Sequence, residues 1–148
     1  WSMLADTTAA PVTRETRMPD ISDLLASPDM KVTGRRVKVS FPNGRSHRVS
    51  LAEEADSWEL RGVVLSPDTV SDRYGDDESD RIGLALRAWQ RNSTARLCGF
   101  RLDADGALVG EATVPKTGLT GEELTEMVRA VARACDLLEA HLTGKDEA

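Results

Sequence analysis

The sequence predicts an α+β domain: a five-stranded, largely antiparallel sheet with helices packed on it, in the order α-β-β-β-α-β-β-α. Five segments alternate apolar and polar residues, as strands with one buried face do. Three other segments repeat apolar residues every three or four positions, as helices on a sheet do. With 148 residues, 40% hydrophobic and 30% charged, the chain has the size and composition of a single globular domain.

The first segments set the boundaries of this domain. Residues 1–18 are small, Thr-rich and without periodicity, which predicts a disordered lead-in. Trp1 and Ser2 precede Met3, which we interpret as the native start. The stretch PDISDLLASPDM, residues 19–30, predicts a short helix that Pro28 ends. The domain is expected to span residues 19–144, with a tail over 145–148.

Three alternating segments follow and predict a meander. RRVKVSF, residues 35–41, is joined to HRVSL, residues 47–51, through an Asn-Gly pair, which is a strong signal for a hairpin. WELRGVVL, residues 58–65, is the third strand. The residues expected to share the buried face are Val37, Val39, Phe41, Val49, Leu51, Trp58, Leu60 and Val64.

The stretch from residue 66 to 92 predicts a polar connecting loop that leads into the second helix. Tyr74 lies in the loop, and acidic residues 76–80 gather where the helix begins, as its dipole favours. Gly83 weakens the helix and is expected to mark close packing on the sheet. The apolar stripe expected to face the core is Ile82, Ala85, Leu86 and Trp89.

Two strands and a long helix complete the domain. RLCGFRL, residues 96–102, and ALVGEATV, residues 107–114, flank a DADG turn, and Pro115 ends the second strand. Thr120 with Glu123 forms a capping box for a helix of about 23 residues, or about 35 Å, which Gly144 ends. Its apolar stripe is Leu124, Met127, Val128, Val131, Cys135, Leu138 and Leu142.

The charge balance disfavours nucleic acid as a partner. The chain has 25 acidic and 19 basic residues, a net charge of −6 and a pI near 5.0. A local group of cations is interpreted as the solvent side of the hairpin: Lys31, Arg35, Arg36, Lys38, Arg45 and Arg48.

The chain is expected to be cytoplasmic and without a membrane segment. It has no apolar run of about 20 residues and no signal peptide. Cys98 and Cys135 lack metal-ligand spacing and are expected to be buried free thiols.

No motif in the sequence predicts catalysis, a metal site or a cofactor. His47 and His141 lie on different predicted elements, and both are expected at the surface. No nucleophile elbow, phosphate loop or paired-cysteine motif occurs. The DDESD and DADG stretches lack the ligand spacing of a calcium loop. The sequence therefore predicts a protein that is not an enzyme.

Candidate partner-binding residues are Trp58, Leu60 and Tyr74. Trp58 and Trp89 fall at core-facing positions of their elements, so both are expected in the core. If Trp58 or Tyr74 instead lies on an open face of the sheet, it would anchor a protein partner. The long last helix either covers its own sheet or leaves part of its stripe for a second copy. Four residues of this helix are expected either in the core or in a dimer contact: Leu124, Met127, Val131 and Leu138.

Three stretches together resemble the YbjN and type III secretion chaperone-like domain family, in its actinobacterial form. They are WELRGVVL (58–65), RAWQRNSTARLCGFRLDADGAL (87–108) and LVGEATVPKTGLTGEELTEMVRAVARACDLLEAHLTG (108–144). The resemblance covers about residues 19–144. It implies a compact α+β fold, frequent homodimers and no enzymatic activity. Secretion chaperones of this fold bind an extended segment of a partner, and the YbjN branch is linked to sensory or stress regulation.

Three functions compete at this point. The first is a cytoplasmic, non-enzymatic protein-binding module, chaperone-like or a regulatory adaptor, acting as a homodimer. The second is a small-ligand-sensing regulatory domain, or an enzyme, with a pocket between sheet and helices; its candidates are Cys98, Cys135, Trp89 and Arg101. The third, nucleic-acid binding through the basic stretch 31–48, ranks last on charge.

Overall fold

The structure is a computed structural model that describes residues 21–92 and 98–144, without the side chains of Trp89, Gln90 and Asn92. The expected lead-in, the tail and the side chain of Trp89 therefore lie outside the described part. The elements, in chain order, are α2 (Ile21–Leu24), β1 (Met30–Thr33), β2 (Arg36–Ser40), β3 (Ser46–Glu53), β4 (Ser57–Leu65), α3 (Pro67–Tyr74), α4 (Glu78–Asn92), β5 (Gly99–Leu102), β6 (Leu108–Pro115) and α5 (Gly121–Thr143).

The strands form one antiparallel sheet in the order β1-β2-β3-β4-β6-β5. The α+β class and the antiparallel sheet with packed helices are confirmed. Two details of the prediction are wrong. The sheet has six strands, because β1 (Met30–Thr33) pairs with β2 (Arg36–Ser40) through a tight turn at Gly34 and Arg35. The expected loop after β4 contains a helix of its own, α3, which Ser66 caps and Pro67 begins.

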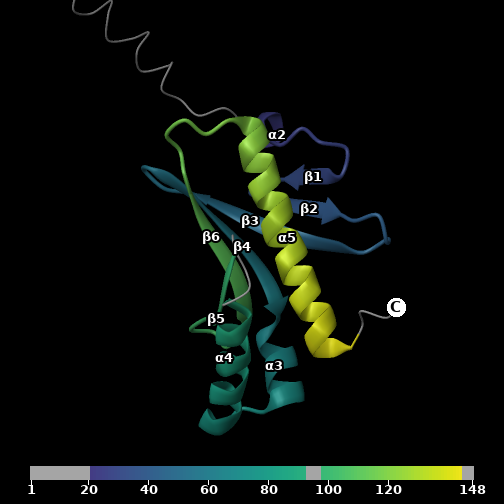
Figure 1. The fold of residues 1–148 in the computed structure, drawn as a ribbon, viewed down its shortest axis with the longest axis vertical. Coiled ribbons are helices and arrows are strands. Elements are labelled where there is room, and N and C mark those ends of the chain that lie inside the picture. Colours follow the sequence, from purple (N-terminus) through teal and green to yellow (C-terminus); the bar gives the residue numbers. More distant parts are fainter. Residues whose placement is uncertain (1–20, 93–97, 145–148) are drawn as a thin grey trace, which may run out of the picture.

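Helix α5 lies diagonally across one face of the sheet, while α3 and α4 lie together at one end of the molecule (Figure 1). α5 packs on β3, β4 and β6, and α4 packs on β5. The opposite face of β2 and β3 carries exposed residues at every second position. Within the described residues, the sheet therefore has one covered face and one open face.

The core lies between α5 and the covered face. The meander residues expected to face inward are buried, with the exception of Phe41, which is half-buried. Of the α5 stripe, Met127 and Leu142 are half-buried and the other members are buried. The capping box at Thr120 and the left-handed Gly144 at the helix end, with φ of 72°, are both confirmed.

The apolar stripe predicted for the second helix is wrong. The buried residues of α4 are Leu84 and Ala88, whereas Ile82 and Leu86 are 53% and 55% exposed. Gly83 does not mark close packing, because a Cβ built there meets no atom within 4 Å. Since α4 rests on the sheet only at β5, most of its circumference faces outward. Its apolar residues at 82 and 86 are therefore a surface feature.

Candidate protein-binding groove

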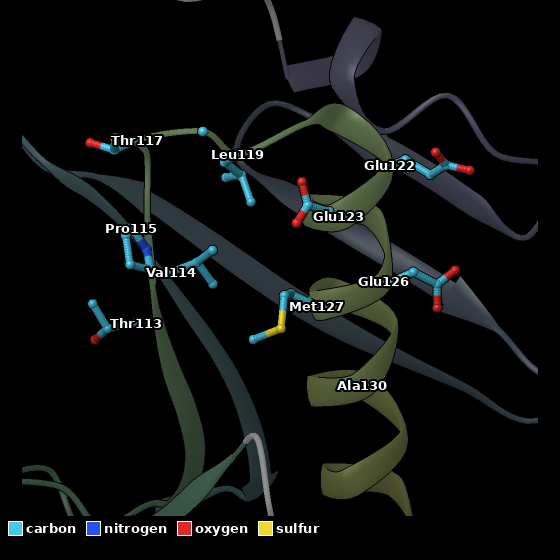
Figure 2. Close-up of a pocket in the computed structure, with 11 residues that line it drawn as sticks. Thr113, Val114, Pro115, Thr117, Leu119, Glu122, Glu123, Glu126, Met127 and Ala130 are labelled. Atoms are coloured by element: carbon cyan, nitrogen blue, oxygen red, sulfur yellow. The ribbon is translucent and has the colours of Figure 1, made fainter.

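A groove of 760 Å³ runs between the end of β6 and the first half of α5. Figure 2 shows Val114, Leu119 and Met127 pointing into the space between the strand and the helix. Glu123 lies on the strand side of the helix, while Glu122 and Glu126 point away from the strand along the outer border of the groove, and Thr113, Pro115 and Thr117 belong to the strand side. The groove thus has an apolar floor and an acidic rim.

The connection between β6 and α5 holds the two walls apart. Pro115 ends the strand, and the backbone N–H of Lys116 donates to the carbonyl of Asp56 at 2.9 Å. Leu119 N–H then donates to Lys116 O at 3.0 Å, with Gly118 at a positive φ of 73°, which favours glycine. Thr120 begins the helix at once. The chain therefore crosses from sheet to helix in a fixed turn, and the space below the turn is left open.

The acidic rim is only partly neutralised by the protein itself. Glu123 accepts the backbone N–H of Thr120 at 3.1 Å as part of the capping box. Glu126 pairs with Arg129. Glu122 is exposed and has no ion pair within the described residues. A positively charged group on a partner would therefore meet favourable charge at this rim.

One side of the groove is bordered by a strand edge. β6 pairs with β4 along its whole length, from Leu108 to Pro115. β5 pairs only with Leu108–Glu111, because it begins at Gly99. Along Ala112–Pro115, no described strand takes the second edge of β6. Unpaired backbone groups on a strand edge can accept an additional strand.

The structure places Trp58 and Leu60 in the core beneath α5, 1% and 0% exposed. Arg35 and Lys116 cover the ring of Trp58, at 6.0 and 5.7 Å from its centroid. Leu124, Val131 and Leu138 are likewise core residues of the chain itself. A partner-binding role of Trp58 and Leu60 stays a prediction, and it would require α5 to move. Of the predicted site residues, Met127 lines the groove.

Tyr74 does not lie in a loop, as the sequence had suggested. It is the last residue of α3 and is half-buried. Its hydroxyl donates to the carbonyl of Leu142 at 3.3 Å, and the guanidinium of Arg87 lies 5.9 Å from its ring centroid. Tyr74 thus ties α3 to the end of α5 and to α4. A role in partner binding stays a prediction for this residue too.

Cys98 and Cys135 lie in the core, whereas Arg101 lies on the surface. Cys98 and Cys135 are buried free thiols, as predicted, and a Cβ built on Gly110 would lie 2.9 and 2.6 Å from their Sγ atoms. The hydrogen bond to Cys98 and burial both raise the pKa of the Cys135 thiol. Arg101 is exposed and pairs with Glu111. The two thiols are packed against the sheet at Gly110, and the small-ligand alternative stays a prediction.

One cluster has the donor types of a metal site, and the sequence analysis missed it. His47 Nδ1 and carboxylate oxygens of Asp136 and Glu139 lie within 4.8 Å of one another. His47 is not at the surface but 9% exposed, in phase with buried Val49 and Leu51. This alternation in β3 could have indicated from the sequence that His47 is buried. It could not have indicated its neighbours Asp136 and Glu139, which are distant in sequence.

Arg45 already provides the cation of this cluster. Its Nε and Nη2 donate to the two carboxylate oxygens of Asp136 at 3.0 Å each. The other ring nitrogen of His47, Nε2, is 2.8 Å from the carbonyl of Val63. A metal ion would have to compete with the guanidinium for Asp136. We therefore interpret the cluster as an ion-pair network that holds the β2–β3 hairpin against α5.

Comparisons with known proteins were made by family, by sequence and by structure. No protein-family model and no curated protein matches the chain. The solved HopA1–SchA chaperone–effector complex matches at 16% identity, covering 81% of this chain and 88% of that chain, with a TM-score of 0.40. The ExsC–ExsE complex matches at 16% identity, covering 80% and 90%, with a TM-score of 0.46. The YbjN and actinobacterial parts of the resemblance have no counterpart in these comparisons and stay predictions.

A search of the described helices for a membrane span found none that is both long and apolar enough.

Proposed function

We propose that the protein is a non-enzymatic protein-binding module, a chaperone-like or regulatory adaptor of the cytoplasm, which takes an extended segment of a partner protein. The observation that carries the proposal is the apolar groove of 760 Å³ beside Ala112–Pro115 of β6, whose second edge is taken by no strand in the described part of the chain. A strand added at this edge gains backbone hydrogen bonds, and every second side chain can enter the groove. If the chain is a YbjN-type protein, the partner is a component of sensory or stress regulation.

The groove indicates the chemistry of the partner segment. Val114, Leu119 and Met127 form an apolar floor, which suits Leu, Ile, Val or Met side chains. Glu122 and Glu126 on the rim favour a Lys or Arg at a neighbouring position. The expected segment is therefore extended, apolar on one side and basic on the other.

The proposal includes a homodimer, and α4 is the surface that we assign to it. Ile82 and Leu86 are exposed one helical turn apart, and Ala85 between them is exposed as well. Because the first turn of α4 carries Glu78 and Asp80 and its last turn carries Arg91, two antiparallel copies would bring opposite charges together. A two-fold axis between the two copies would pair the same surface of α4 with itself in this antiparallel way.

The test is site-specific photocrosslinking in extract of the native cell. A photoreactive amino acid replaces Thr117 or Glu122 on the groove rim, and Arg133 as a control away from the groove. We expect one dominant protein to crosslink from the rim positions and not from the control. Ala130→Arg, which fills the groove, should abolish that crosslink, whereas Leu137→Arg on the exposed side of the same helix should leave it.

Two results would count against the proposal. Equal crosslinking from rim and control positions would indicate non-specific contact. No crosslink from either rim position, with a folded protein by circular dichroism, would leave the groove without a protein partner.

A further inference from the structure

The open face of the sheet carries an uncompensated row of cations. Lys31, Lys38 and Arg48 lie directly opposite one another on β1, β2 and β3. All three are exposed, as is Arg36 two residues before Lys38. None of the four has an ion pair within the described residues, although Arg61 and Arg101 on the same face pair with Asp103 and Glu111. These four residues are called the basic row below.

This arrangement is unfavourable for the isolated chain. Like charges directly opposite on neighbouring strands destabilise the pairing of those strands. The sequence has enough acidic residues to neutralise the row, with a net charge of −6, but places them elsewhere. Six of them fall within residues 67–80, in and around α3 and the start of α4. The repulsion on the open face would be relieved by negative charge from a second molecule.

The face is also hollowed where the basic row meets β4. Arg36, Arg48, Ser46 and Ser50 line a hollow of 410 Å³, which is also lined by Arg61, His47, Val63 and the carboxylate-bearing Glu139. Arg61 already pairs with Asp103, so Arg36 and Arg48 are the cations of the hollow that have no ion pair within the described residues. Guanidinium groups bind carboxylates in a bidentate way, so these two side chains are suited to an anionic side chain at the edge of the hollow away from Glu139.

We propose that the basic row and this hollow are a docking surface for an acidic segment of a partner protein. Neighbouring strands lie about 4.8 Å apart, so the row spans about 10 Å, which three or four residues of an extended chain cover. A short acidic segment can lie on this row alone. A long polyanion such as nucleic acid would continue over the acidic remainder of the molecule and be repelled. This surface is on the other face of the sheet from the groove and goes beyond the proposed function.

The probe is a fluorescent short peptide of alternating glutamate and serine, titrated with the full chain at low salt by fluorescence anisotropy. We expect binding that weakens strongly when salt is raised to about 0.3 M. The double variant Lys38→Glu/Arg48→Glu should bind at least about tenfold more weakly. The matched control, Arg73→Glu/Arg133→Glu, changes the net charge equally at exposed positions elsewhere and should bind like the wild type.

Three outcomes would overturn the inference. The peptide fails to bind at low salt, or both double variants lose binding equally, which would indicate an effect of net charge alone. Tighter binding of a single-stranded oligonucleotide of similar length would make the row a nucleic-acid surface instead. Since Ala130→Arg blocks only the groove, unchanged peptide binding by that variant separates this surface from the proposed function.

Discussion

Two glycines determine how closely α5 approaches the sheet. Gly62 on β4 and Gly110 on β6 are direct cross-strand partners. The Sγ of Cys135 lies only 2.9 Å from a Cβ built on Gly62 and 2.6 Å from one built on Gly110. Real side chains do not approach so closely, so both positions require glycine as long as Cys135 keeps its place. The sheet therefore presents no side chain at Gly62 and Gly110, where Cys135 of the helix rests on it.

Replacing Gly110 by alanine is expected to destabilise the fold strongly. The new methyl group would also meet the Sγ of Cys98 and the ring of Phe100, each at 2.9 Å. Overpacking of this kind costs about 1–3 kcal/mol, which urea unfolding can measure. Gly99→Ala is the control on the neighbouring strand, because its Cβ meets nothing within 4 Å. Equal stability of Gly110→Ala and wild type would show that α5 can shift freely.

The environment of a single residue could not be predicted where it depends on contacts between distant segments, as the burial of His47 shows. The alternation around His47 placed it in phase with Val49 and Leu51, yet a histidine is usually assigned to the surface. Its burial depends on Arg45 in the same hairpin and on Asp136 and the carbonyl of Val63, which come from two other parts of the chain. Sequence periodicity describes the face that a residue occupies, but not the partners that satisfy a buried polar group.

At the scale of elements, α5 is held to the start of the domain by an ion pair. Arg129 donates through Nε to Asp29 at 2.8 Å and through Nη2 to the other oxygen at 3.0 Å. Asp29 lies between α2 and β1. These hydrogen bonds, with a further one from Ser27, hold the pKa of Asp29 well below its ordinary value of 3.8. The carboxylate is therefore bound more tightly in the folded chain than the protonated acid.

This ion pair predicts a pH-dependent contribution to stability. A group whose pKa is lowered by folding stabilises the fold above its unfolded pKa and loses that effect as the pH falls through its folded pKa. Arg129→Met should lower the free energy of unfolding by about 1 kcal/mol at neutral pH, since both side chains are partly exposed. Urea unfolding should show this difference shrinking below about pH 4. Arg133→Met, at an exposed position on the same helix, is the control. A difference that stays constant down to strongly acidic pH would contradict the argument.

Regular elements could be predicted when local chemistry and burial agreed. Thr120 and Glu123 form the capping box of α5, and its stripe is buried except at the half-buried Met127 and Leu142. For α4, the local apolar pattern and the observed burial disagreed. Its apolar residues at 82 and 86 suggest a core-facing side, but Leu84 and Ala88 face the protein instead. Periodicity identifies an apolar face without stating whether the chain itself or another molecule covers it.

At the scale of the whole molecule, the fold class follows from the sequence, while the candidate groove does not. Val114, Leu119 and Met127 were each identifiable as apolar positions. The groove arises because β5, among the described residues, begins opposite Glu111 and α5 crosses the sheet away from the end of β6 (Figure 1). Both are relations between distant segments. The basic row was visible in the sequence as cations within residues 31–48, but its register across three strands was not.

The assembly of the molecule is the last prediction. If α4 pairs with α4 of a second copy, light scattering after gel filtration should give twice the chain mass of 16.1 kDa. Leu86→Glu places a charge in the centre of that contact and should give a monomer, while circular dichroism stays unchanged because Leu86 is 55% exposed. Leu137→Glu introduces the same charge at a 46% exposed position on α5 and should remain dimeric. A wild-type monomer at concentrations of about 100 µM, which exceed the Kd of stable homodimers, would refute the homodimer. If both variants dissociate the dimer, the assignment to α4 is refuted, because the introduced charge alone would then explain the loss of the dimer.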